Sequence, residues 1–146
     1  MKRKRAVGIV IKEDKILLIF RRRETMEYYI FPGGGVEEDE TREKAVIREV
    51  KEETSIEVVP LKLIYELEDS LCVHLCYLCS YKKGRPSLGD FNEKASMNKN
   101  NFFKPIWLPT TKLSSTTIYP REIGDWIRED IPNNFIHTPK SAYTFQ

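Results

Sequence analysis

Three glutamates near the middle of the chain, Glu49, Glu52 and Glu53, have the spacing of neighbours on one face of a helix. At about 100° per residue, positions i, i+3 and i+4 gather their carboxylates into an arc of roughly 100°. Carboxylate oxygens are the ligands that hard divalent cations prefer, and a cation would relieve the repulsion among three like charges. The competing interpretation is a solvated acidic face on which Arg48 pairs with Glu52 at i+4.

Residues 41–54 combine good helix formers with an absence of Gly and Pro, which predicts one continuous helix beneath these carboxylates. Thr41 is the expected N-cap, and Lys44 at the third helical position excludes a reciprocal capping box. The apolar stripe consists of Val46, Ile47 and Val50. The solvated face consists of Lys44, Arg48 and Lys51. Because the carboxylates border the apolar stripe, we expect them at the rim of the core.

A glycine-rich turn after a short strand leads directly into this helix, and this context makes the pattern specific. Residues 34–56, GGVEEDETREKAVIREVKEETSI, resemble the Nudix box G-x5-E-x7-R-E-U-x-E-E-x-G-U, in which U is aliphatic. The positions in register are Gly34, Glu40, Arg48, Glu49, Val50, Glu52, Glu53 and Ile56. Ser55 departs from the pattern, because the family has there a glycine that takes the left-handed conformation without a Cβ penalty. We interpret Ser55 as a cost in stability.

The resemblance implies an α+β Nudix fold, in which a mixed β-sheet is sandwiched between helices. It also implies an enzyme that hydrolyses the pyrophosphate bond of a nucleoside diphosphate linked to another moiety, with a (d)NTP or a modified nucleotide as the favoured substrate. The cofactor would be Mg²⁺ or Mn²⁺, which screens the phosphate charge and lowers the pKa of the attacking water.

The same resemblance assigns roles to single residues. Glu49, Glu52 and Glu53 would be metal ligands, with the carbonyl of Gly34 as a further candidate. Arg48 would orient the carboxylates, and Glu40 would anchor the loop onto the helix.

The general base is open between two locations, because the family takes it either from the box helix or from a later loop. Glu93 is the loop candidate, and an exposed loop carboxylate is the competing interpretation. His74 and His137 are weaker alternatives, since a single His on a strand is usually an ordinary packing residue.

Substrate contacts are expected from the residues that flank the box. Arg21, Arg22 and Arg23 end a strand that leads toward it, and arginine suits phosphate, although a solvated basic turn explains them equally well. Gly33 and Gly35 of the glycine-rich turn complete the candidate substrate-binding set. The aromatic residues Tyr28, Tyr29 and Phe103 could stack on a base but favour the core. The Pro or Tyr that the family resemblance associates with ADP-ribose or dinucleoside polyphosphates is absent from residues 70–73.

The remaining elements follow from apolar periodicity and turn residues. We predict strands within 5–22 around a turn at 13–15, a charged loop at 23–27, and a strand at 28–31 stopped by residues 32–35. Strands at 61–67 and 71–81 should pair antiparallel, and residues 82–104 should be a polar loop. A strand at 105–108 and a helix at 120–129 complete the prediction, and residues 131–146 are left unassigned.

Composition favours one domain over residues 1–146, in the cytoplasm. With 24 Lys and Arg against 22 Asp and Glu, the net charge of +2 argues against a stable nucleic-acid binder, and no apolar run is long enough to cross a bilayer. Cys72, Cys76 and Cys79 suit neither a disulfide framework nor a shared metal, because a strand would hold Cys72 and Cys76 roughly 13 Å apart. The sequence does not give the oligomeric state, and we keep a homodimer as an alternative to a monomer.

Two other functions compete with a nucleotide pyrophosphohydrolase. One is an RNA 5′-end pyrophosphohydrolase, for which the basic residues 2–5 are slight support in a nearly neutral chain. The other is a Nudix domain that binds a nucleotide without cleaving it. Such modules usually lose box carboxylates and carry a DNA-binding domain, and we expect neither feature here.

Overall fold

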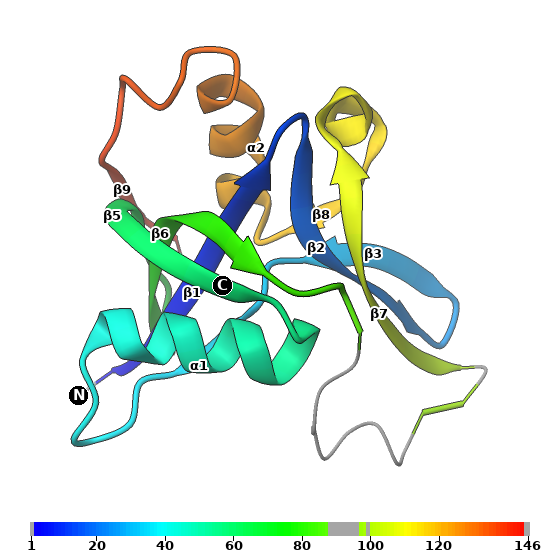
Figure 1. The fold of residues 1–146 in the computed structure, drawn as a ribbon, viewed down its shortest axis with the longest axis horizontal. Helices are drawn as coiled ribbons and strands as arrows, with labels where there is room; N and C mark the ends of the chain where they lie inside the picture. The colour runs from blue at the N-terminus through cyan, green and yellow to red at the C-terminus, as the bar shows by residue number, and fades with distance from the viewer. Residues whose placement is uncertain (1, 88–96, 99, 145–146) are drawn as a thin grey trace.

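A mixed β-sheet lies between two helices in the computed structural model, which describes residues 2–87, 97–98 and 100–144 (Figure 1). The strands are β1 (Arg3–Lys12), β2 (Lys15–Arg23), β3 (Met26–Ile30), β4 (Gly33–Gly35), β5 (Glu57–Glu68), β6 (Cys72–Lys83), β7 (Asn101–Pro109), β8 (Ile118–Tyr119) and β9 (Lys140–Tyr143). The helices are α1 (Arg42–Thr54), the short 3₁₀ helix η2 (Thr110–Ser115) and α2 (Arg121–Asp130). This arrangement confirms the expected α+β class.

The sheet runs in the order β8-β3-β2-β1-β6-β5-β9 among the described residues, with β4 added to β1 and β7 added to β2. Strands β1 and β2 pair only beside their turn, at Ile11 with Ile16 and Lys12 with Lys15, so the two halves of the sheet splay apart. The expected antiparallel pairing of β5 with β6 is confirmed. Parallel pairing of β1 with β6 places residues from the start of the chain beside those of the middle.

Two apolar cores cover the two faces of the sheet. One core joins the sheet to α1 and includes Val46, Val50 and Ile56. The other joins it to α2 and includes Ile123 and Ile127. The helices therefore hold the sheet between them, as the resemblance implied.

Several predicted boundaries are wrong, and β-pairing explains most of the differences. The charged loop shrinks to residues 24–25, because β2 and β3 continue as a paired ladder to Arg23 and Met26. Strand β7 begins at Asn101 inside the predicted polar loop, because it pairs with the whole length of β2. Residues 33–35 form a strand against β1, although three glycines carry no strand propensity.

The tail, which had no predicted structure, contains β9 and a buried anchor. Strand β9 pairs parallel with the end of β5. Asp130 at the end of α2 is fully buried and accepts hydrogen bonds from the Tyr65 hydroxyl (2.6 Å) and the Lys140 ammonium (2.8 Å). The anchor therefore ties the tail to both α2 and β5.

The three cysteines are free, with Cys76 and Cys79 buried in different cores as the alternation predicted. None of the helices in the described part of the chain is long and apolar enough to span a membrane.

Candidate functional site

Helix α1 packs closely against the sheet, and this contact fixes the position of its carboxylates. Its N-cap is Thr41, whose hydroxyl accepts from the Lys44 amide as predicted. Val46 and Val50 are fully buried, and a Cβ on Gly8 of β1 would lie 2.6 Å from Val50 Cγ2. Ile47 is 38% exposed, so its place in the predicted apolar stripe is wrong and Ala45 is buried instead.

The helix ends at the residue that departs from the family pattern. Ser55 adopts the left-handed conformation, with φ 67°, and its amide donates to the Lys51 carbonyl. The backbone therefore keeps the geometry that favours glycine, as the sequence predicted, and Ser55 tolerates it.

The three glutamates of α1 occupy different environments. Glu53 points inward, and its carboxylate accepts from the backbone amide of Gly33 at 2.7 Å. Glu49 lies against Gly34, where an added Cβ would come within 2.4–2.5 Å of the Glu49 carboxyl group. The Glu52 side chain is 49% exposed. The glycine strand β4 thus forms the floor on which the two inner carboxylates rest.

Arg48 binds the loop and the helix together. Its guanidinium donates to both carboxylate oxygens of Glu40 (2.7 and 2.9 Å), to Glu49 (2.7 Å) and to the Gly35 carbonyl (3.0 Å), and lies 3.3 Å from Glu52. These bonds, above all those that Arg48 donates to Glu40, raise the pKa of Arg48, and the same two bonds lower the pKa of Glu40 to about 2. Arg48 is therefore half-buried in an ion network, not on the solvated face where the helical pattern put it.

Burial disfavours the charged form of Glu53. Burial raises its pKa to about 8, and the negative charges of Glu49 and Glu52 add to this, against the opposing effects of the Gly33 amide and Arg5. A cation beside Glu53 would favour its charged form. Oxygen donors of this kind suit Mg²⁺ or Mn²⁺, so the chemistry of the residues fits the implied metal. Within residues 2–87, 97–98 and 100–144, however, no three acidic, His or Cys side chains already converge with metal-site geometry.

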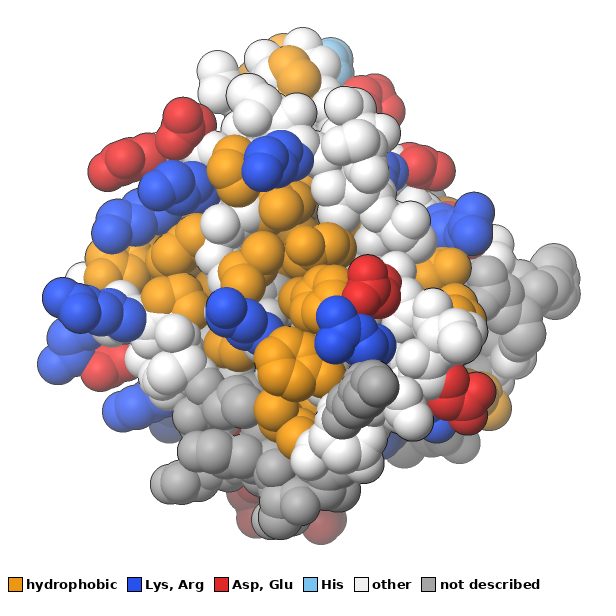
Figure 2. Space-filling view, turned by 90° about the vertical axis from the view of Figure 1, so that its right-hand side faces the viewer, with side chains coloured by type: hydrophobic (Ala, Val, Ile, Leu, Met, Phe, Trp, Pro, Cys, Tyr) orange, Lys and Arg blue, Asp and Glu red, His pale blue; other side chains and the backbone are white. Residues whose placement is uncertain are grey.

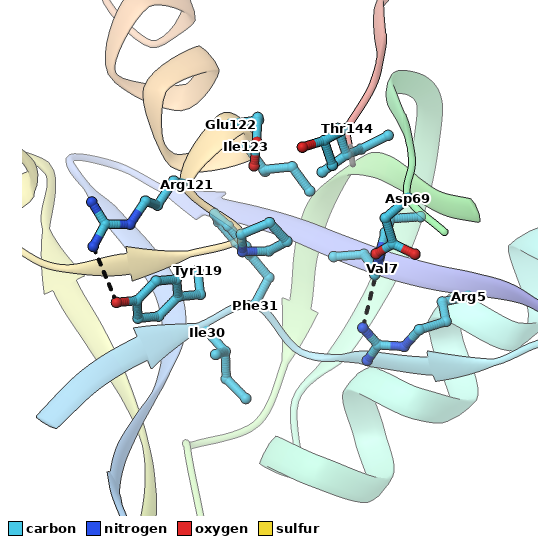
Figure 3. A pocket seen from close by; sticks show the side chains of 13 residues that line it. Arg5, Val7, Ile30, Phe31, Asp69, Tyr119, Arg121, Glu122, Ile123 and Thr144 are labelled. Atoms are coloured by element: carbon cyan, nitrogen blue, oxygen red, sulfur yellow. Dashed lines mark hydrogen bonds and ion pairs between the residues drawn. The ribbon is translucent and has the colours of Figure 1, made fainter. Parts of the chain in front are cut away.

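A cavity of about 340 Å³ opens beside β4, on the face of the sheet that α2 covers (Figure 3). Its apolar walls are Val7, Ile30, Phe31, Leu67, Pro120 and Ile123. Its polar groups are Arg5, Asp69, His74, Tyr119, Arg121, Glu122 and Thr144. Strands β1, β3, β5, β6 and β8, helix α2 and the tail all contribute to it.

A polar chain connects this cavity with the carboxylates of α1. The Gly33 amide donates to Glu53, and the Gly33 carbonyl accepts from Arg5 at 3.3 Å. Arg5 also lies 3.4 Å from His74 Nδ1, and His74 Nε2 lies 2.9 Å from the Asp69 carboxylate. The contact with His74 lowers the pKa of Asp69 to about 2, helped by backbone amides. Gly33 is shared by both sites, and any Cβ there would lie 2.6 Å from the Ala6 carbonyl oxygen.

The arginines of β2 point in different directions. Arg22 pairs with Glu27 at 2.7 Å, and the Arg21 guanidinium lies 3.9 Å from the centroid of the Phe103 ring. Arg23 lines a second cavity with Tyr28 and Tyr119. Hydrophobic side chains interspersed with Lys and Arg cover much of the side of the molecule on which β3 and β7 lie (Figure 2). Phe103 is buried and Tyr29 packs against the core, in line with the core interpretation.

Sequence reasoning missed Arg5, Asp69 and Thr144. In the sequence Arg5 belongs to a basic run that suggests a solvated N-terminus. Only its pairing with Gly35 and His74 in the sheet places it in the cavity wall. Thr144 lay in the unassigned tail. His74, considered only as a weak candidate base, lines the cavity, and His137 is exposed in the turn after α2. Glu93 lies outside the described residues.

Comparison with known proteins identifies a family model that matches most of this chain and relatives that match part of it. The family model described as NUDIX domain matches residues 2–127. An ADP-ribose pyrophosphatase of Methanocaldococcus jannaschii is 50% identical over 50 residues, which are 34% of this chain and 30% of that protein. An RNA pyrophosphohydrolase of Marinomonas sp. is 36% identical over 58 residues (40% and 36%), and a MutT-like protein of Streptomyces ambofaciens is 40% identical over 79 residues (53% and 51%). The chain thus spans about half or less of the length of these relatives.

Solved structures are similar over nearly the whole chain. A NUDIX hydrolase of Nitrosomonas europaea has a TM-score of 0.78 at 16% identity, covering 99% of this chain and 80% of that one. A structure from a study of MutT from Aliivibrio salmonicida and Vibrio cholerae has a TM-score of 0.70 at 20% identity. The match covers 91% of this chain and 99% of that one. At these identities the likeness establishes the shared fold.

Proposed function

The chain belongs to the NUDIX family, and from this premise we propose that it hydrolyses the pyrophosphate bond of a nucleoside triphosphate or a modified nucleotide. The observation that carries the proposal is the shared glycine strand. Gly33 and Gly34 contact the carboxylates of Glu53 and Glu49, and Gly33 also contacts Arg5 in the wall of the cavity. One substrate could therefore place its nucleoside in the cavity and its phosphates beside α1.

The carboxylates of Glu49, Glu52 and Glu53, with the Gly34 carbonyl, would hold the cation. When bound, Mg²⁺ or Mn²⁺ supplies neutralisation of the diphosphate and a lowered pKa of water. Arg48 orients Glu49 and Glu52 through its hydrogen bonds, and Glu40 fixes Arg48 in turn. The proton of the attacking water passes to a carboxylate oxygen, either on α1 or on Glu93.

The cavity suits the nucleoside part of such a substrate. Its volume of about 340 Å³ lies within the usual range for small-molecule pockets, and apolar walls with a few polar groups are typical of them. Arg21, Arg22 and Arg23, with the backbone of Gly33 and Gly35, remain proposed phosphate contacts. Three free cysteines are consistent with a cytoplasmic location, and a homodimer remains a proposal.

An RNA 5′-end pyrophosphohydrolase is the second candidate, because several partial relatives carry that name. Its support from the basic start of the chain is reduced, since Lys2 pairs with Glu68 at 2.6 Å. A binding module without catalysis is disfavoured by the complete set of box carboxylates.

A substrate panel tests the proposal. Nucleoside triphosphates, oxidised nucleotides, ADP-ribose and 5′-triphosphorylated RNA are incubated with Mg²⁺ or Mn²⁺, and released phosphate and pyrophosphate are measured. We expect metal-dependent cleavage of at least one nucleotide, with a higher kcat/KM for nucleotides than for RNA. Higher kcat/KM for RNA would establish the second candidate instead.

Two substitutions connect that activity to α1. Glu52→Gln and Glu53→Gln keep the side-chain shape but cannot neutralise a cation, so kcat should fall by about 10²–10³-fold or more. Glu43→Gln on the exposed first turn of the same helix is the matched control and should retain wild-type activity. Wild-type turnover in both test variants would contradict the assignment of the metal site.

A further inference from the structure

Arg5 stands at the junction of the cavity and the glycine strand. Its residue in β1 is paired with Gly35 of β4 on one side and with His74 of β6 on the other. Its half-buried side chain lines the cavity (Figure 3). It also donates a hydrogen bond to the Gly33 carbonyl. Arg5 is therefore a cation that borders both the cavity and the strand beneath the carboxylates.

The guanidinium of Arg5 retains unused binding capacity. Its contacts with the Gly33 carbonyl and with His74 Nδ1 are long, at 3.3 and 3.4 Å, and no carboxylate pairs with it among the described residues. Arg48 differs, because its guanidinium is engaged by Glu40 and Glu49 at 2.7 Å. An arginine carries five N–H donors in a planar fork, so Arg5 can still accommodate an anion.

His74 and Asp69 hold this side chain in position. His74 is buried and touches Arg5 through Nδ1, while its Nε2 lies 2.9 Å from Asp69. Asp69 is fixed by the amides of Leu71 (2.8 Å) and Cys72 (2.7 Å). This fixed pair limits the positions that the Arg5 guanidinium can take, which reduces the conformational freedom it loses on binding a ligand.

We propose that Arg5 binds the α-phosphate of the nucleotide, the phosphate attached to the sugar, with His74 and Asp69 as its positioning residues. The proposal rests on the proposed function, because it assumes a nucleoside in the cavity and the remaining phosphates at α1. The α-phosphate joins those two parts of a nucleotide, and Arg5 joins the two sites. A doubly hydrogen-bonded guanidinium and phosphate would match in charge and in geometry.

Binding measurements separate a phosphate contact from a purely structural role. The four common nucleoside 5′-monophosphates and their four nucleosides are titrated by calorimetry against the wild type and Arg5→Gln, with Mg²⁺ present. Arg5→Gln should weaken monophosphate binding by about 10- to 100-fold, as expected for a charge-assisted bond, and leave nucleoside binding within about twofold. Lys4→Gln, an exposed neighbour that loses the same charge, is the control and should bind both like the wild type.

Arg5→Lys and His74→Phe refine the assignment. Lys keeps the charge without the fork, so it should recover part of the monophosphate affinity. His74→Phe leaves Arg5 in place but unsupported, and should cause a smaller loss that is again confined to the monophosphate. Circular dichroism and melting temperature identify any variant that does not fold, and Arg5→Lys then replaces Arg5→Gln in the comparison.

Each outcome is decisive. Equal losses for monophosphate and nucleoside, no loss for either, or no monophosphate binding by the folded wild type would overturn the role of Arg5. Phosphate-dependent binding through Arg5 in a protein that cleaves no nucleotide would uphold this role and refute the proposed hydrolysis. Nucleotide cleavage by a protein in which Arg5→Gln does not selectively weaken monophosphate binding would uphold the proposed hydrolysis and refute the role of Arg5.

Discussion

The carboxylate site on α1 and the cavity beside it are built in opposite ways. Contacts in the carboxylate site are local, because Arg48 bonds Glu40 and Gly35 only 8 and 13 residues away, and Gly33 and Glu53 are 20 apart. The cavity depends on distant segments, such as Arg5 and His74, which are 69 residues apart. A local site has a fixed spacing in the sequence. A site assembled from many elements has none, so its residues can vary independently.

The relatives show a related contrast. Three of the curated relatives align with this chain over 50, 58 and 79 residues at 36–50% identity. Solved structures align over 91–99% of the chain at only 16–20% identity. The fold is therefore shared across the chain, while these three pairwise sequence matches cover 34–53% of it.

Gly34→Ala should have the largest effect of the changes that probe this contrast. The new Cβ would come within 2.5 Å of the Glu49 carboxyl group, and displacing that group should lower kcat by about 10²-fold or more. Gly35→Ala is the matched control, because its Cβ meets only the flexible guanidinium of Arg3 and should reduce kcat less than about threefold. Equal activities of the two variants in steady-state assays would show that the close contact between Gly34 and Glu49 has no catalytic importance.

Arg48→Leu should have the next largest effect, and this effect should be on stability. It removes several charge-assisted hydrogen bonds and leaves Glu40 and Glu49 without their partner, at a cost of about 2–3 kcal/mol in the free energy of unfolding. Arg22→Leu breaks the exposed pair with Glu27 and should cost less than about 1 kcal/mol. Urea denaturation measures both, and similar costs would mean that the Arg48 network adds no stability beyond that of a surface pair.

Acid should weaken the same network. The pKa of Glu40 is lowered to about 2 in the folded protein, so its contribution is fully present above its ordinary pKa of 4.5 and is lost as the pH falls toward 2. The contribution should be on the order of 2 kcal/mol. Glu40→Gln should therefore lose less stability than the wild type between pH 5 and pH 2 in urea titrations. An unchanged slope would refute this role, and Glu27→Gln serves as the exposed control.

Thr144→Leu should have the smallest effect and should act on the cavity alone. The larger side chain enters the cavity wall and should raise KM by roughly three- to tenfold, about 1 kcal/mol, with kcat nearly unchanged. Ser141→Leu adds the same bulk to an exposed position of β9 and should change neither constant. A fall in kcat without a rise in KM would indicate that the tail acts on the carboxylate site instead.

Sequence reasoning succeeded where the physics is local. The helix, its Thr41 cap and the left-handed position of Ser55 all depend on residues within a few positions of one another. It failed for β4, β9 and the start of β7, because these strands exist through pairing with distant partners and their own residues have weak strand propensity or no clear alternation. Arg5 was missed for the same reason, since only the β1–β6 register gives it a neighbour in His74.

The anchored tail has a consequence for the order in which the protein acquires its parts during synthesis. A ribosome adds about 5–20 residues per second from the N-terminus, so α1 and the glycine strand are made well before residues 140–144. Until β9 pairs with β5 and Lys140 reaches Asp130, the cavity lacks the wall that Thr144 provides. The residues that carry the carboxylates are therefore synthesised before the residue that completes the cavity wall.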